Sequence, residues 1–587
     1  MKNSFAKKLG MSLFLIAVFT FISLSFLSDI SFTNKDISNL NKAIDDDLAK
    51  KISTIADAPP IIMVGRLTST FDEYNQNIVN HKGISSDEAS GLIEMLNGDA
   101  SNFNSSFIAE NLGEKSWASQ KLTEYSSWMM DKKWDRFPEF KSQLENKISD
   151  VNKAAVEKFG LSEDRQKQVK LDVMLAGAPD YLSTGLWALL IFGLASIGGF
   201  LHFIPMGRKQ AGIHNNHIYR RKSQTRMGPA IVVFVLLVGF YIVLYEFPAY
   251  MANQIALLDP LSSVMAGGMA NQWFLYGFLY TLSMFVMGVR MWLKYKGNKY
   301  QRVRTVAVFF FQVAFAFTLP QILTRLQLPA YDVKSIWPLE YSFFFDYRVD
   351  EYMAAGTIGL FLFFWGIVLF AIGVPLLTYF YGKRWYCSWV CGCGGLAETV
   401  GDPYRHLSDK RLGAWQIERW LVHGVLVFAV VMTGLTAYTA FSGEAEIFGM
   451  NSYSVRSTYG FFIGFIFAGA VGTGFYPVMG NRVWCRFGCP LAAYLGLVQR
   501  FKSKFRITTN GGQCISCGNC STYCEMGIDV RWYAQRGQNI VRSSCVGCGV
   551  CSAVCPRGVL NLENGKEEGR INDNPILIGR ERAELNL

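Results

Sequence analysis

Cysteine is absent from the first 386 of the 587 residues, and all 13 cysteines of the chain follow that point. A disulfide framework is therefore excluded for the front part of the chain. The polar segment 30–181 also contains no Gly-rich phosphate loop and no flavin-attachment motif of the S-G-A-T type. Neither phosphate-loop nucleotide binding nor an attached flavin is expected there.

Eight of the cysteines form two runs near the C-terminus, each with the spacing C-x2-C-x2-C-x3-C. This is the spacing of a bacterial two-cluster ferredoxin, in which three cysteines of one run and the fourth of the other hold each [4Fe–4S] cluster. Disulfides or two zinc sites are the alternatives, but zinc sites usually pair C-x2-C knuckles across longer intervals. The expected ligand sets are Cys514, Cys517, Cys520 and Cys555 for the first cluster, and Cys545, Cys548, Cys551 and Cys524 for the second.

The first run departs from the ferredoxin pattern at its end. Pro556 follows Cys555, as the pattern requires, but Glu525 follows Cys524. The chain is expected to leave the first run differently, with ligation retained. Cysteines in thiolate clusters also imply that this part of the chain faces a reducing compartment.

Four further cysteines lie in a short internal repeat. Residues 382–395 (GKRWYCSWVCGCGG) and 480–493 (GNRVWCRFGCPLAA) align at a constant offset of 98, and each carries C-x3-C. A helix would place both thiols of a copy on one face. Together Cys387, Cys391, Cys485 and Cys489 would form a four-thiolate site at the membrane boundary.

Three interpretations of this site stay open. It is a further iron–sulfur centre, a redox-active thiol set or transient metal site such as one for copper, or a group of structural cysteines. Cys393 is an extra thiol beside the first copy, either an alternative ligand or a bystander.

Long apolar runs make the chain a membrane protein, with 50% hydrophobic residues and a mean hydropathy of +0.18. Residues 10–27 are long enough to span a bilayer, so an uncleaved anchor is favoured over a signal peptide. Links 206–226 and 294–304 are basic and contain no acidic residue, which places them in the cytoplasm. Seven further spans are predicted at 182–205, 228–248, 272–293, 305–323, 355–381, 420–441 and 458–479.

The predicted fold is mainly α, a polytopic helical membrane protein of about eight spans with a small α+β ferredoxin domain at the cytoplasmic C-terminus. Segment 30–181 is expected to be mostly helical and extracytoplasmic, with a capping box at Ser85–Glu88. The predicted regions are an anchor at 1–29, the outer domain at 30–181, seven membrane helices with both C-x3-C motifs at the cytoplasmic face at 182–499, the ferredoxin domain at 500–565 and a tail at 566–587.

Three polar residues near span ends are weaker candidates. His202 and His423 both fall near the cytoplasmic side, where they could bracket a haem, or simply form hydrogen bonds between helices. Glu246 falls at the outer end of the third span, where it could accept a proton from quinol or sit in the membrane interface.

Two C-x3-C motifs after membrane spans, followed by a two-cluster ferredoxin module, resemble the NosR/NapH family of membrane polyferredoxins, which includes the copper-reducing assembly factor CcoG. The resemblance covers roughly residues 355–560. It implies electron transfer linked to quinol oxidation, or electron delivery to the maturation of a metal centre. NosR-like proteins carry an outer flavin domain, whereas the outer segment here lacks the flavin motif.

The expected function is electron transfer, as an oxidoreductase component of a respiratory chain in a bacterial inner membrane. Electrons would pass between a quinol or cytoplasmic donor and a periplasmic acceptor or reductase. The alternatives are a copper-reducing assembly factor for a client metalloenzyme and a redox-linked sensor. A nucleic-acid partner is not expected.

Overall fold

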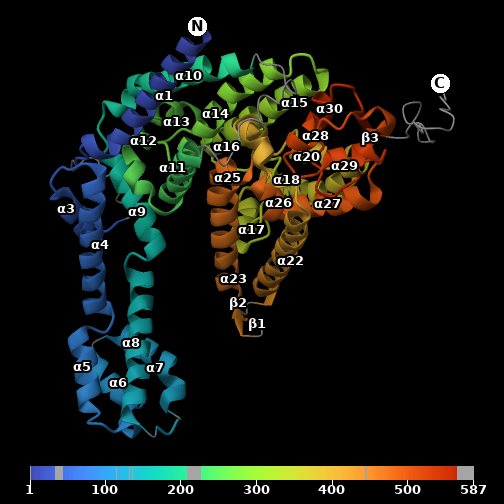
Figure 1. Ribbon diagram of the computed structural model, residues 1–587. Helices are drawn as coiled ribbons and strands as arrows, with labels where there is room; N and C mark the ends of the chain where they lie inside the picture. The colour runs from blue at the N-terminus through green and yellow to red at the C-terminus, as the bar shows by residue number, and fades with distance from the viewer. Residues whose placement is uncertain are drawn as a thin grey trace. The chain divides into compact units, whose positions relative to one another are not determined.

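The computed structural model describes residues 2–32, 44–113, 115–130, 132–134, 136–207, 227–442, 446–447 and 449–564. Most of the basic link 206–226 and the whole tail 566–587 lie outside these residues. The chain forms two compact units (Figure 1). Unit 1 comprises Met1–Phe21, Thr184–Tyr245 and Leu257–Leu587, and unit 2 comprises Ile22–Ser183 and Glu246–Ala256.

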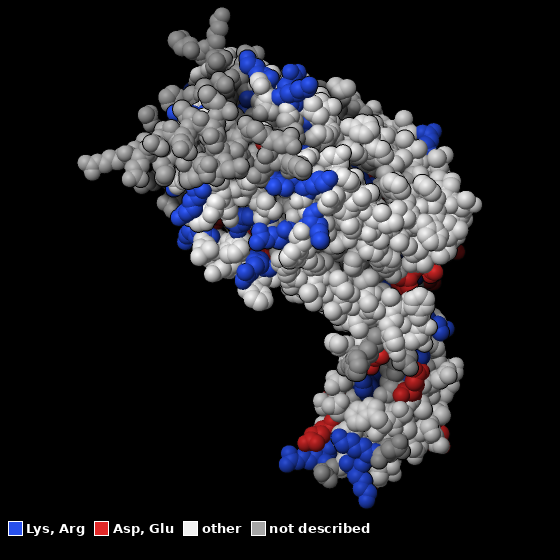
Figure 2. All heavy atoms as spheres, turned by 90° about the vertical axis from the view of Figure 1, so that its right-hand side faces the viewer, with Lys and Arg blue, Asp and Glu red and all other residues white. Residues whose placement is uncertain are grey.

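Eight helical stretches in the described residues are long and apolar enough to cross a membrane, which confirms the predicted mainly α, polytopic fold. The surface of unit 1 in Figure 2 accordingly includes a broad expanse without Lys, Arg, Asp or Glu. The eight stretches are Ser4–Leu27 in α1 (Lys2–Leu27), Leu186–Pro205 in α10 (Leu186–Gly207), Gly228–Glu246 in α11 (Met227–Glu246), Gln272–Lys294 (α14), Lys299–Arg325 (α15, η6 and α16), Gly356–Tyr381 (α18, η7 and α19), Leu412–Ser442 (α22) and Ser452–Gly474 (α23, η9 and α24).

Helix boundaries differ from the prediction where polar residues continue a helix. Helix α22 begins at Leu412, eight residues before the predicted span, because its first turns carry polar residues that hydropathy discounts. One of these, Glu418, is buried and paired with Arg486 at 3.0 Å. At its other end α22 leads through the hairpin β1 (Glu446–Ile447) and β2 (Met450–Asn451) into α23, which lies beside it (Figure 1).

Helices α1 and α10 cross at two glycines. A Cβ on Gly10 would lie 2.6 Å from the carbonyl oxygen of Gly198, and a Cβ on Gly198 would lie 2.6 Å from the backbone nitrogen of Phe14. Only glycine permits backbones to approach this closely, as at other small-residue crossings of membrane helices.

The ferredoxin part is closed by a two-stranded antiparallel sheet of β3 (Phe505–Thr509) and β4 (Leu560–Asn564), in which Phe505 faces Asn564. Between the strands, each cysteine run contributes one short helix, α28 (Asn519–Thr522) or α30 (Val550–Ala553). A left-handed glycine precedes each of them, Gly518 with φ +78° and Gly549 with φ +71°. The two runs therefore fold in the same way.

Unit 2 is helical, and α4 and α8 lie side by side along it (Figure 1). Its predicted capping box is present, since the Ser85 and Glu88 side chains each accept the other's backbone N–H. Apolar side chains from α5 to α8 pack into one core. The principal helices are α4 (Pro60–Lys82), α5 (Ser86–Met95), α6 (Ser105–Leu112), α7 (Ser116–Met130), α8 (Phe137–Phe159) and α9 (Glu163–Ala176).

Candidate metal centres

Each ferredoxin-type cysteine set lines its own cavity. One encloses about 350 Å³ of space between its walls, and the other about 370 Å³. In both, three cysteines come from one run and the fourth from the other run. The first cavity is lined by Cys514, Cys517, Cys520 and Cys555, and the second by Cys545, Cys548, Cys551 and Cys524. The structure thus brings together the sets that the spacing predicts.

A third cavity of about 280 Å³ is lined by both C-x3-C motifs and by Cys393. Its four motif thiols belong to residues no more than 8% exposed. They are held by α20 (Arg384–Cys387) and α21 (Gly392–Thr399) in the first copy, and by α26 (Val483–Phe487) and α27 (Pro490–Lys502) in the second. The repeat therefore places Cys387, Cys391, Cys485 and Cys489 around one space.

Neither C-x3-C motif lies on one continuous helix, so the expected shared helix face does not form. In the first copy the amides of Val390 and Cys391 both donate to the carbonyl of Tyr386, at 3.0 and 2.8 Å. In the second copy Gly488 and Cys489 donate to Trp484 in the same way, at 2.9 and 3.0 Å. This tight turn directs the second thiol of each motif back toward the first.

The first C-x3-C loop contacts the interior of two membrane-spanning stretches rather than their ends. Tyr280 donates its hydroxyl hydrogen to the carbonyl of Gly392 at 2.8 Å, and the Gln312 amide donates to that of Val390 at 2.6 Å. Tyr280 lies eight residues into α14, or about 12 Å from its start. Along α14 the third cavity is therefore well inside the span, whereas the sequence placed it at the membrane boundary.

Arg482 connects the third cavity with the second ferredoxin cavity. Its guanidinium lies 3.6 Å from the Sγ of Cys485, and it forms ion pairs with Glu398 at 2.8 Å and with Glu525 at 3.1 Å. Glu525 directly follows Cys524 and also pairs with Arg405 at 2.8 Å. The residue that replaces the ferredoxin proline therefore anchors the ferredoxin part to the C-x3-C region.

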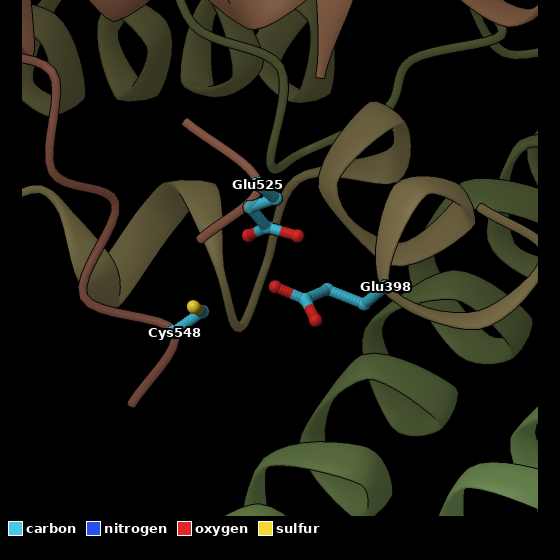
Figure 3. A group of neighbouring side chains, drawn as sticks. All are labelled: Glu398, Glu525 and Cys548. Atoms are coloured by element: carbon cyan, nitrogen blue, oxygen red, sulfur yellow. The ribbon is translucent and has the colours of Figure 1, made fainter. Parts of the chain in front are cut away.

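The carboxyl groups of Glu398 and Glu525 point toward each other, with the sulfur of Cys548 beside them (Figure 3). Ligand atoms of the three residues lie within 4.8 Å of one another. Burial raises the pKa of Glu525, and the neighbouring Glu398 adds to the rise against the lowering effect of Arg405. Although burial opposes it, the surrounding arginines hold the pKa of Glu398 well below its usual range. The pKa values of these two neighbouring carboxyl groups are therefore shifted in opposite directions, that of Glu525 upward and that of Glu398 downward.

The same network extends to Asp402, which pairs with Arg290 at 2.6 Å, Lys294 at 2.8 Å and Arg405 at 2.8 Å. With Arg304 and Arg482, five cations surround three carboxyl groups. The excess positive charge suits anionic thiolate clusters, whose potential depends on nearby charge. The sequence did not predict this network. Its only indications were the correspondence of Arg384 with Arg482 in the repeat and the presence of Glu525 after Cys524.

The structure gives the three weaker candidates other partners. Nδ1 of His202 lies 3.0 Å from the carbonyl oxygen of Lys7, and Nδ1 of His423 lies 2.7 Å from that of Arg419 one turn earlier in its helix. In unit 2, the carboxylate of Glu246 accepts from the Lys167 ammonium at 2.6 Å. No thiol cavity is lined by any of the three.

The fold and these sites define a multi-pass membrane protein with ferredoxin-type [4Fe–4S] domains. A family model described as a 4Fe-4S dicluster domain matches residues 513–560. This region therefore carries two [4Fe–4S] clusters. A second, described as a 4Fe-4S binding domain, matches residues 362–413 and 459–508, which contain both C-x3-C motifs.

Two curated relatives agree with this class. The putative electron transport protein YccM of Escherichia coli is 30% identical over 158 residues, covering 25% of this chain and 43% of that protein. The methylamine utilization ferredoxin-type protein MauN of Paracoccus denitrificans is 28% identical over 166 residues, covering 26% of this chain and 53% of that protein. The chain thus spans about half the length of these relatives. No solved structure matches it.

Proposed function

We propose that the chain is a three-centre electron-transfer protein, with a further iron–sulfur centre held by Cys387, Cys391, Cys485 and Cys489. The observation that carries this is the third cavity. Four buried thiols line a space of about 280 Å³, close to the 350 and 370 Å³ of the two ferredoxin-type cavities. The match of a 4Fe-4S binding domain to both motifs supports the same ligand set.

The donor set fits such a centre in charge as well as in number. Thiolates are soft ligands suited to iron–sulfur clusters, and burial raises the pKa of the free Cys387 thiol to about 12. Bound metal would supply the positive charge that stabilises the thiolates, and Arg482, 3.6 Å from the Cys485 sulfur, adds to it. Each centre, when loaded, would carry one electron at a time.

The protein's own residues hold the centres in series. Arg482 contacts the third cavity on one side and Glu525, next to Cys524, on the other. Gln499 donates to the carbonyl of Cys545 at 2.9 Å and accepts from the amide of Lys383 at 2.7 Å. These contacts fix the ferredoxin part against the C-x3-C loops, so the spacing between redox centres is held constant.

The electron path would join a quinol or cytoplasmic donor to an extracytoplasmic acceptor in a respiratory chain of the bacterial inner membrane. The basic links support a cytoplasmic ferredoxin part. The position of Tyr280, eight residues into α14, brings the third centre part of the way through the span. That placement shortens the distance that an electron must travel across the bilayer. The two ferredoxin clusters alone provide no redox centre within that distance.

Iron and acid-labile sulfide per chain test the proposal after anaerobic purification. Native protein is expected to hold about twelve iron atoms, against about eight when Cys387, Cys391, Cys485 and Cys489 are all serine. A matched variant, Cys393→Ser, should keep about twelve. About eight in all three proteins would reject the third cluster. Copper bound by the native protein and lost from the quadruple variant would then favour a copper-reducing assembly factor.

A further inference from the structure

A larger cavity lies beside the metal centres and holds none of the ferredoxin cysteines. It encloses about 1920 Å³ of space between its walls, open solvent included, and lies between the first turns of α22, the length of α27 and the ferredoxin part. Its lining includes apolar side chains, among them Leu412, Val422, Leu497 and Phe501. The lining is also strongly basic, with seven Lys or Arg side chains against the two carboxylates of Glu418 and Asp529.

Five of those seven cations form no ion pair with a carboxylate in the described part of the chain. Their partners are backbone carbonyls and the rings of Trp415 and Trp420. Lys383 donates to the carbonyls of Ala492 and Ser543 at 3.1 and 3.0 Å. Lys410 donates to that of His406 at 3.2 Å, and Arg500 to that of Val541 at 2.9 Å. Arg419 and Arg542 lie over the ring of Trp415, at 5.3 and 4.8 Å from its centroid.

Such a concentration of positive charge around one hollow is self-repelling, and an anion bound there would relieve the repulsion. The two remaining arginines are already neutralised, Arg411 by Asp409 at 2.6 Å and Arg486 by Glu418 at 3.0 Å. The five uncompensated cations come from different elements that converge on the cavity. The cavity is therefore built to receive negative charge.

The cavity lies where α22 enters the membrane. Trp420 is 74% exposed on the first turns of that helix, and Phe501 is 75% exposed at the end of α27. Tryptophan and arginine at the end of a spanning helix mark the level of the lipid head groups. A free, water-soluble anion would gain nothing from the apolar side chains of the lining, whereas acyl chains would cover them.

We propose that this cavity binds the phosphate group of an anionic phospholipid, with its acyl chains along Val422 and Leu497. Basic pockets between membrane helices hold anionic head groups in this manner. Arg419 belongs to a membrane helix and Arg542 to the ferredoxin part, and both lie over Trp415. One lipid would thus fasten the ferredoxin part to the membrane helices beside Cys485, which also lines the cavity.

The test uses the full chain with its iron, and native mass spectrometry to count bound lipid. Phosphatidylglycerol and phosphatidylcholine with identical acyl chains are offered in turn. One phosphatidylglycerol per chain is expected to remain bound, and phosphatidylcholine is expected to be lost. Arg419→Gln and Arg542→Gln should each weaken phosphatidylglycerol binding roughly fivefold, and the double variant roughly 25-fold.

Arg302→Gln is the matched control, because Arg302 also lies over a tryptophan, Trp292, at 4.1 Å from its centroid, but does not line the cavity. Its binding should equal that of the native protein, and an unchanged iron content shows that each variant folds. Equal retention of the two lipids, or an equal loss in the control, overturns the proposal. So does displacement of the lipid by inorganic phosphate, which indicates a free-anion site, or by a soluble quinone analogue, which indicates a quinone cavity.

Discussion

Replacing Glu398 by glutamine is expected to destabilise the region that joins the third cavity to the ferredoxin part. Glu398 accepts two hydrogen bonds from Arg304, both at 2.8 Å, one from Arg482 at 2.8 Å and a further one from Arg405. Its side chain is 1% exposed, so water cannot take over from it. Glutamine fills the same space but leaves three buried guanidinium groups without the negative charge of the Glu398 carboxylate.

Removing one partner of a buried ion pair costs about 3–5 kcal/mol, because the remaining charge stays buried. For unit 1, whose bounds enclose about 400 residues, that corresponds to a fall of roughly 5 °C in unfolding temperature. The assay follows the iron–sulfur absorbance of the detergent-solubilised protein during heating, at one fixed scan rate since membrane proteins unfold irreversibly.

Glu525→Gln is the matched comparison, because Glu525 lies in the same network but burial raises the pKa of its carboxyl group. Glutamine resembles a protonated glutamic acid in shape and in its ability to donate, so its cost should be smaller than that of Glu398→Gln. Equal losses in the two variants, or a larger loss for Glu525→Gln, would refute the opposite pKa directions assigned to the two carboxyl groups.

Three further predictions follow from single contacts. Gly382→Ala should lower the unfolding temperature, because Gly382 has φ +66° and a Cβ there would lie 2.6 Å from Phe505; its ψ of 178° places it in a backbone region that is essentially restricted to glycine, and an alanine forced into that region alone costs about 1–3 kcal/mol. Tyr280→Phe, which deprives the Gly392 carbonyl of its donor, should cost about 1 kcal/mol and shift the spectrum of the third centre more than those of the ferredoxin clusters, as read by electron paramagnetic resonance. Raising the pH should destabilise the native protein but not Glu525→Gln. The folded-state pKa of Glu525 is raised, so the stability that this group contributes is lost as the pH rises through that pKa. The folded-state pKa of Glu398 is lowered, so its contribution to stability stays constant above about pH 4.5. A parallel pH dependence in both proteins would contradict the last of these.

The cysteine groupings could be predicted because the spacing of the cysteines along the chain determines which of them can ligate the same cluster. In each ferredoxin run three thiols lie within seven residues, and the exchange of the fourth follows from the shared fold of the two runs. The eight spans were predictable for a similar reason, since continuous apolar runs leave few alternatives in a bilayer. Hydropathy does not predict where helix α22 begins, because the charged residue Glu418 is counted as polar although it is buried in an ion pair with Arg486.

The charge network could not be predicted because its members lie far apart in the chain. Arg384 and Arg482 correspond in the repeat, yet they have different surroundings. Arg384 lies over the ring of Phe505, at 4.7 Å from its centroid, whereas Arg482 is fully buried among carboxylates. The partner Glu398 precedes Arg482 by 84 residues, and nothing in the local pattern joins them. Besides the repeat itself, Glu525, in place of a proline, was the one sequence feature that pointed to this region.

The four thiols of the third cavity come from two loops separated by nearly a hundred residues of chain. A centre bound there acts as a cross-link, since it ties α20 and α21 to α26 and α27. A covalent bridge across a loop of about 100 residues removes roughly 4.7 kcal/mol of chain entropy from the unfolded state. The metal would then be inserted only after the chain segments that carry both C-x3-C motifs had entered the bilayer. The presence of the centre would therefore indicate that the membrane part is completely assembled.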